Sequence, residues 1–368
     1  MTFKYVDEYK VIPVGLFFNM LSLLVFTFYD DYWSLLLCRG LTGLFQEFIC
    51  VYFPVWVDTF ASQQTNSSWM SIILIGATLG NITGYITAAS VQDNIGWRWA
   101  FYIQSIGLSL NILSYWMVPQ SIVNLRTTTP TIMAHQKKSQ MAEEESLKKS
   151  ICKVITNGGF LRMCLSVTIL YFVVTGIQFW FSDFLITVMK MQKEVVFSLF
   201  TFVSISGPVL GVVIGGWLSS YLGGYNSGKS LYFMAAISVF SVFVSAPIPY
   251  LGYETKWLQI VFLWIMLFCG GMMLPAIMGM MLNSVDEGLK TTANSIANTS
   301  FNVFGFLPSP YIYGLIADYG DVVGGNKRNA MKLNMTLPTV FATLLVSHAF
   351  IFKQRNREDC RRPVINGG

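Results

Sequence analysis

Two charged side chains lie inside one long apolar stretch of the sequence, residues 34–57. An ionisable group within such a stretch is costly to bury, so it is a functional candidate by default. At 3.6 residues per turn, Arg39 and Gln46 share one helix face about 10 Å apart, and Glu47 borders that face. A carboxylate near an arginine could exchange a proton, or it could clamp a neighbouring helix. We take Arg39, Gln46 and Glu47 as candidates for substrate binding or coupling, with the structural clamp as the alternative.

A second group of polar side chains carries amides instead of charges. Asn294, Asn298 and Asn302 recur every four residues, so a helix would present them as one stripe. Gln178 is an amide inside another apolar stretch. We expect the stripe to face a central cavity and to contact a solute. Hydrogen bonding to neighbouring helices is the alternative.

Prolines interrupt several of the apolar stretches. The segment FGFLPSPYIYGLIAD, residues 304–318, carries both Pro308 and Pro310. Proline removes a backbone hydrogen bond, and inside a membrane the freed carbonyl needs protein or water as its partner. We therefore expect a hinge at Pro308 and Pro310. The further hinge candidates are Pro54, Pro208 and Gly211.

Glycines recur at every fourth position in two places, which lets helices approach closely in lipid. The two repeats are Gly76, Gly80 and Gly84, and Gly207, Gly211 and Gly215. They predict packing faces, and a packing face that also slides during function is the alternative.

The sequence lacks the motifs of several other chemistries. It contains no phosphate-binding loop, no GxSxG and no HExxH, so an enzyme is not expected. Its six cysteines have no CxxC spacing and its two histidines stand far apart, so neither a metal site nor a cofactor is expected. The net charge of +5 comes from basic residues between apolar runs and at the C-terminus, a membrane pattern that excludes nucleic acid as a partner.

The elements that must position these residues are membrane spans. The chain is 54% hydrophobic and only 12% charged, about half the charge of a soluble domain. A span needs about 20 apolar residues, and ten segments meet or approach this length: 11–28, 34–57, 68–90, 99–119, 160–187, 195–221, 230–252, 257–283, 291–317 and 335–353.

The spans predict an all-α, polytopic membrane helix bundle of four plus six spans. We expect an incomplete N-terminal bundle over residues 1–119, a cytosolic linker over 120–158, a six-helix bundle over 159–353 and a basic cytosolic tail over 354–368. With both termini in the cytosol, the cytosolic segments carry more lysine and arginine than the segments on the opposite side of the membrane. We therefore expect both termini in the cytosol.

The arrangement and its motifs resemble the major facilitator superfamily, and within it the Spinster-like branch of lipid transporters. Four stretches carry the resemblance: Arg39-Gly40-Leu41-Thr42-Gly43 through Pro54; Gly96-Trp97-Arg98-Trp99-Ala100-Phe101; Val174-Thr175-Gly176 through Trp180 and Phe184-Leu185; and Ala293 through Gly305 with Ser309-Pro310-Tyr311 and Gly314. The sequence departs from the branch at three positions. Gln46 stands where the branch has glutamate, and Asn302 and Phe306 stand where the branch often has histidine and aspartate. Ser220 stands where the superfamily's loop motif has aspartate.

The resemblance implies a secondary transporter that works by alternating access. It implies membrane lipids as surroundings and an amphiphilic substrate such as a lysolipid or sphingoid, while a sugar or an organic anion stays open as the substrate. Proton coupling is expected from the buried Glu47 carboxylate. It also places the first two helices of the superfamily before Met1, so about 60–80 further residues are expected upstream. The plasma membrane or an endolysosomal or vacuolar membrane is the expected location.

Two other functions remain open at this point. Four helices before the linker leave part of a cavity wall missing, so a truncated, non-transporting membrane protein that acts as a partner or regulator is one alternative. A passive lipid pathway without coupling is the other.

Overall fold

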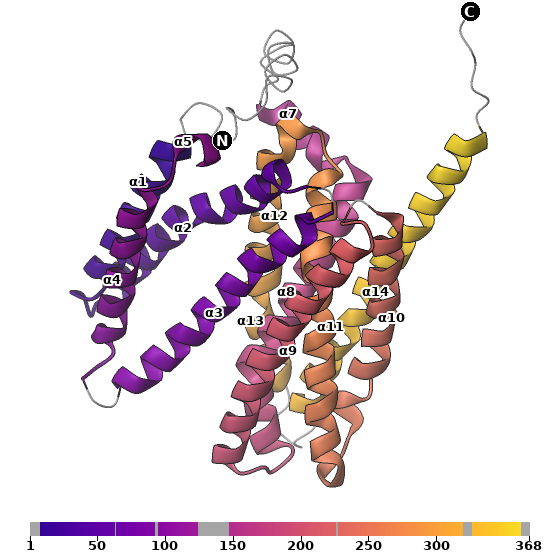
Figure 1. Ribbon diagram of the computed structural model, residues 1–368. Helices are drawn as coiled ribbons and strands as arrows, with labels where there is room; N and C mark the ends of the chain where they lie inside the picture. The colour runs from indigo at the N-terminus through magenta and orange to yellow at the C-terminus, as the bar shows by residue number, and fades with distance from the viewer. Residues whose placement is uncertain are drawn as a thin grey trace, which may run out of the picture. The chain divides into compact units, whose positions relative to one another are not determined.

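Helices make up all the regular structure in the described part of the chain. The computed structural model describes residues 8–62, 64–92, 95–123, 147–225, 227–318 and 326–361. The first helices are α1 (Glu8–Phe26), α2 (Tyr32–Phe60), α3 (Asn66–Gln92), α4 (Arg98–Tyr115), α5 (Gln120–Val123) and α7 (Leu147–Ile155). They are followed by α8 (Gly158–Thr187), α9 (Lys193–Tyr221), α10 (Gly228–Ser245), α11 (Lys256–Asn283), α12 (Lys290–Ser300), α13 (Pro308–Asp318) and α14 (Asn326–Arg361) (Figure 1).

Three short 3-10 turns and one π-helical segment complete the order. The turns are η2 (Ile248–Tyr250), η3 (Tyr253–Thr255) and η4 (Glu287–Leu289), and the π segment is η5 (Phe301–Phe306). Every predicted span coincides with a helix, the ninth with α12, η5 and α13 in succession. The predicted all-α membrane bundle is confirmed.

Seven helical stretches in the described part are long and apolar enough to cross a membrane. They are α1, α2, α8, α9, α10 with η2, η3 with α11, and most of α14. The other three predicted spans are α3, α4 and the broken helix α12–η5–α13. The broken helix is divided into α12 and α13 of 11 residues each, so neither piece is long enough to cross a membrane by itself, and the sequence of α12, KTTANSIANTS, is polar. The chain is thus an integral, multi-pass membrane protein.

Residue contacts divide the chain into two compact units. Unit 1 takes in Met1–Phe60 and Leu79–Cys152, and unit 2 takes in Ala61–Thr78 and Lys153–Gly368. The first half of α3 thus belongs with unit 2, and the second half belongs with unit 1. The bundle boundaries expected from the sequence, 119 and 159, stay a prediction.

The linker and the tail hold helical structure of their own. Residues 120–158 include α5 and α7, while 124–146 lie outside the described residues. The segment 354–361 continues α14, which ends at Arg361, and 362–368 again lie outside the described residues.

In unit 1, α1 packs against α2 and α4 (Figure 1). Val11, Ile12 and Leu16 of α1 share a buried cluster with Val51 and Tyr52 of α2. The short helix α5 is fastened to α2 by two side-chain bonds: the Tyr52 hydroxyl donates to the Val123 carbonyl at 2.7 Å, and the Trp56 indole donates to the Ile122 carbonyl at 2.8 Å.

In unit 2, α8 lies at the centre of the packing, in contact with α9, α11, α13 and α14. Asn157 starts α8 by accepting hydrogen bonds from the backbone N–H groups of Gly159 and Phe160. One buried cluster joins α8, α10, α11, α12 and α14, and a second joins α8, α9, α11, α13 and α14. Because methionine is unbranched and flexible, the buried methionines of α11 fill the irregular space between these helices.

The two glycine repeats have different surroundings. On α9, a methyl group added at Gly211 would overlap the carbonyl oxygen of Phe268 on α11, and one at Gly215 would overlap that of Met272. On α3, a methyl group added at Gly76, Gly80 or Gly84 would meet no atom within 4 Å. The α9 repeat is a close helix–helix contact, whereas no described atom lies that near to the α3 glycines.

Candidate functional site

Arg39 is held over two aromatic rings in unit 1. Its guanidinium carbon lies 4.5 Å from the centroid of the Phe26 ring on α1 and 5.1 Å from that of Phe101 on α4. A ring face attracts a cation, so the two rings fix the guanidinium without using its N–H donors. The Arg39 side chain is exposed, and no hydrogen bond or ion pair joins it to another described residue. It can therefore offer hydrogen bonds to an anionic group.

The other two candidates on α2 lie about two turns beyond Arg39. Gln46 is exposed and Glu47 is half-buried. Eight residues of helix separate Arg39 from Glu47 by about 12 Å, and no ion pair forms between them in the described structure. Arg39 and Glu47 thus act as separate charges, one exposed and one partly desolvated.

The asparagine stripe is hydrogen-bonded along its own helix. Asn298 Nδ2 donates to the Asn294 carbonyl at 3.1 Å, and Asn302 Nδ2 donates to the Asn298 carbonyl at 2.9 Å. Asn294 is buried, Asn298 half-buried and Asn302 exposed, so the stripe leaves the core as it approaches the helix break. On α8, Gln178 is exposed. That the stripe and Gln178 contact a solute stays a prediction.

The ninth span is broken where the prolines predict it. The N–H of Leu307 donates to the carbonyl of Asn302, five residues back, at 3.0 Å. This π-type spacing widens the helix, and such bulges often mark functional sites. Pro308 then begins α13. The Trp180 indole of α8 donates to the Pro310 carbonyl at 3.0 Å, so a protein donor satisfies a backbone group next to the break.

Replacing both Pro308 and Pro310 with alanine tests whether the break bends during transport. We expect a folded protein with a slower transport rate, because alanine lets the N–H ladder close and stiffens the span. Transport rates would be compared at equal amounts of protein in the membrane. The matched control is Pro338→Ala, which removes a proline from inside α14, away from the π segment. An unchanged rate in the double variant would reduce the two prolines to structural kinks.

The remaining hinge candidates occupy packed positions. Pro54 is buried inside α2. Pro208 lies inside α9 where α11 passes closely, since a methyl group added at Gly271 would come within 2.6 Å of the Pro208 carbonyl oxygen. Gly211 follows one turn later at the same contact. The packing of these three residues is thus observed, while their role as hinges stays a prediction.

One ion pair in unit 2 could not be recognised from the sequence. Lys327 Nζ on α14 lies 2.8 Å from an Asp183 carboxylate oxygen on α8, and both side chains are about one-third exposed (36% and 37%). Beside it the Trp180 ring stacks on Tyr313 with centroids 5.2 Å apart. Asp183 lies near the end of its span, where a sequence suggests only a boundary, and its partner is far away in the chain. The pair ties α14 to α8.

A serine-rich junction, also missed by sequence reasoning, fixes the start of α3 within unit 2. Ser67 and Ser219 hydroxyls lie 3.0 Å apart, and Ser219 and Ser230 hydroxyls 2.6 Å apart. The Ser220 hydroxyl accepts the backbone N–H of Ser68 at 3.0 Å. The uncharged Ser220 side chain thus caps the first turn of α3.

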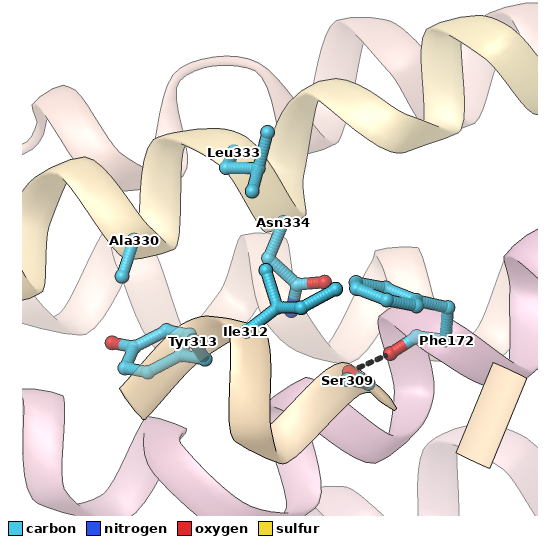
Figure 2. A pocket seen from close by; sticks show the side chains of 7 residues that line it. All are labelled: Phe172, Ser309, Ile312, Tyr313, Ala330, Leu333 and Asn334. Atoms are coloured by element: carbon cyan, nitrogen blue, oxygen red, sulfur yellow. Dashed lines mark hydrogen bonds between the residues drawn. The ribbon is translucent and has the colours of Figure 1, made fainter. Parts of the chain in front are cut away.

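A small pocket opens between α8, α13 and α14, as Figure 2 shows. It is lined by Phe172, Ser309, Ile312, Tyr313, Ala330, Leu333 and Asn334. Its size suits a water molecule and not a lipid. Among the described residues, no group of histidine, cysteine, aspartate or glutamate side chains is arranged to hold a metal ion.

Comparisons with known proteins agree with this architecture. The family model of the Major Facilitator Superfamily matches residues 5–309. Protein spinster homolog 1 of Mus musculus is 25% identical over 314 residues, which is 78% of this chain and 56% of the relative. Probable sphingolipid transporter spinster homolog 2 of Arabidopsis thaliana is 22% identical over 329 residues, 86% of this chain and 65% of the relative. The chain therefore spans less than two thirds of the length of these curated relatives.

Among solved structures, the human organic anion transporter MFSD10 is similar in fold. It aligns with a TM-score of 0.66 at 13% sequence identity, covering 92% of this chain and 77% of that one. At this identity the likeness concerns the fold alone.

Proposed function

The chain belongs to the major facilitator superfamily, and on that premise we propose that it is a secondary transporter of an amphiphilic solute. The solute class is lysolipid- or sphingoid-like, and transport proceeds by alternating access. The similarity to spinster homologues, one of them a probable sphingolipid transporter, supports this class. The polar positions inside the spans support a solute with a polar head.

The observation that carries the proposal is the placement of Arg39. A guanidinium inside a membrane span is retained only at a cost, and here two phenyl rings hold it while its N–H donors stay available. A phosphate or carboxylate head could bind two of these donors at once. An apolar tail would fit Leu36, an exposed leucine of α2 that lies about 60° around the helix from Arg39. An amphiphile with an anionic or zwitterionic head matches both features.

We further propose that protons drive the cycle and that Glu47 carries the exchanged proton. It is a half-buried carboxylate near the middle of α2, and no ion pair or side-chain hydrogen bond joins it to another described residue. Both termini are proposed to lie in the cytosol, in the plasma membrane or an endolysosomal or vacuolar membrane.

The proposal is tested by reconstituting the full chain in proteoliposomes. Uptake of a fluorescent lysolipid, a fluorescent sphingoid base and a small organic anion would be measured against protein-free vesicles. We expect protein-dependent movement of the amphiphiles that saturates with concentration, and much less movement of the organic anion.

Two results would contradict the proposal. If no solute crosses faster than it does in protein-free vesicles, the chain would be a non-transporting membrane protein that acts as a partner or regulator. A flux that rises without saturation would identify a passive lipid pathway, because a carrier has a finite number of sites.

A further inference from the structure

Three helices of unit 2 meet at a polar joint in the middle of α8. The Ser309 hydroxyl of α13 donates to the Phe172 carbonyl at 2.5 Å, and Asn334 Nδ2 of α14 donates to the Val173 carbonyl at 3.2 Å. Ser309 is 1% exposed and Asn334 is 2% exposed. Figure 2 shows the Asn334 amide reaching from α14 toward Ser309 and Phe172. We call these contacts the polar joint.

Gly176 makes room for the polar joint. A methyl group at this position would come within 2.8 Å of Asn334 Nδ2 and 2.9 Å of the Ser309 hydroxyl oxygen. Because both atoms lie near the same point, Asn334 Nδ2 and the Ser309 hydroxyl oxygen are within about 6 Å of each other. A single bridging water can therefore reach both the Asn334 amide group and Ser309.

Among the side chains of the polar joint, Asn334 uses one of its two Nδ2 hydrogens, on the Val173 carbonyl, and leaves its Oδ1 acceptor unused. Asn334 Oδ1 is buried and meets no donor among the described residues. Rotating the amide by 180° would bring that oxygen against the Val173 carbonyl, so the orientation is fixed. Ser309 uses its only hydrogen on Phe172, and the Tyr313 hydroxyl donates to the Lys327 carbonyl at 3.2 Å. A buried acceptor without a partner destabilises the fold, because it has lost its hydrogen bonds to water.

The pocket beside Asn334 has the size of one water. The volume open to the centre of a water molecule is about 10 Å³, close to the minimum that a buried water needs. A site rich in acceptors also suits a cation in principle. No carboxylate lines this pocket, however, and an unpaired buried charge costs far more than the gain from neutral oxygens. A neutral molecule that can donate to Asn334 Oδ1 and also accept from the second Nδ2 hydrogen is the better fit.

We propose that the pocket binds one water molecule, which donates hydrogen bonds to Asn334 Oδ1 and to the Ser309 hydroxyl oxygen. The water completes the polar joint between α8, α13 and α14. It lies next to the proline break, where freed polar groups at membrane depth require such partners. A water bond can shift its geometry as α13 tilts, so the joint stays satisfied while the helix moves.

Two variants at Ala330 test this proposal. Ala330 lines the pocket, is 1% exposed and precedes Asn334 by one helical turn. Ala330→Val and Ala330→Thr add side chains of the same shape into the pocket, and only threonine brings a hydroxyl. If a water is bound, valine displaces it and leaves Asn334 Oδ1 without a donor, whereas threonine supplies one. We expect Ala330→Val to lower the Tm of the purified full chain by about 3 °C or more, and Ala330→Thr to change it less.

A second background makes the result specific to Asn334. In Asn334→Leu, which has no Oδ1 acceptor, threonine at position 330 should lose its advantage over valine, and the order of the two Tm values should reverse. If the pocket binds no water, valine fills it and raises the Tm, while threonine buries an unneeded hydroxyl and lowers it. That reversed order, or equal Tm values for the two variants, in the chain that keeps Asn334 would overturn the proposal.

The salt dependence separates water from a cation. Exchanging sodium for potassium or choline at constant ionic strength should leave the Tm of the unmodified chain unchanged. A rise specific to sodium, lost in Asn334→Leu, would identify a cation site and overturn the water assignment.

Discussion

Replacing both Gly211 and Gly215 with alanine is expected to unfold or strongly destabilise unit 2. The added methyl groups would overlap the backbone oxygens of Phe268 and Met272 on α11. Backbone cannot rotate away as a side chain can, so α9 and α11 must separate. Overpacking typically costs about 1–3 kcal/mol per site, and two sites on one face together approach the total stability of many proteins.

The α3 repeat provides the matched control. Gly76→Ala with Gly80→Ala makes the same chemical change at the same spacing, but the added methyl groups meet nothing within 4 Å. Alanine also favours a helix over glycine by about 1 kcal/mol per residue, so this variant should be at least as stable as the parent. Both double variants would be compared by thermal unfolding and by the monodisperse fraction in detergent. Equal losses would contradict the assignment of α3 as the unpacked repeat.

These glycines show what periodicity in the sequence could and could not predict. The positions of the helices followed from apolar length, because a span has a fixed physical requirement that each segment meets by itself. The two repeats look alike as sequence, since a GxxxG pattern states only that a helix has a small face. Whether another helix occupies that face depends on residues far along the chain, here Phe268 and Met272.

The candidate site divides in the same way. That Arg39 and Gln46 lie on one face of a helix was predictable from 3.6 residues per turn, and both side chains are exposed. That Phe26 and Phe101 hold Arg39 was not predictable, because those rings come from two other helices. The Asp183–Lys327 pair and the Ser309–Asn334 joint were missed for the same reason. The Asn334-Met335-Thr336 sequence has the spacing of a glycosylation acceptor, yet Asn334 is buried and bonded to the Val173 carbonyl.

Replacing Arg39 with alanine is expected to reduce uptake of the amphiphilic solute at least about tenfold. A hydrogen bond to a charged group contributes about 1.5–3 kcal/mol, and 1.4 kcal/mol corresponds to a factor of ten in affinity. Arg39→Lys keeps the charge but loses the planar fork of donors and the stacking on Phe26 and Phe101. The uptake rate of Arg39→Lys should therefore lie between those of the parent chain and Arg39→Ala. Initial rates in proteoliposomes across a range of solute concentrations would separate weaker binding from slower turnover.

Phe26→Leu is the companion test of the ring geometry. It preserves apolar volume but removes one ring face from the guanidinium. We expect weaker binding with little loss of folded protein, and an effect smaller than that of Arg39→Ala. Wild-type uptake in Arg39→Ala, at equal amounts of reconstituted protein, would remove Arg39 from the proposed site.

Glu47→Gln is expected to abolish the response of uptake to an imposed proton gradient while leaving solute exchange partly active. Glutamine has nearly the shape of protonated glutamate but cannot release a proton, so it fixes one step of the proposed cycle. Because Arg39 and Glu47 form no ion pair in the described structure, the two substitutions should have separable effects: Arg39→Ala on binding, and Glu47→Gln on coupling. The measurement is uptake with and without a pH difference across the vesicle membrane, with Gln46→Glu as a second variant that adds a carboxylate on the exposed face. If Glu47→Gln keeps the parental response to the gradient, Glu47 is a structural residue, and any proton used by the cycle binds elsewhere.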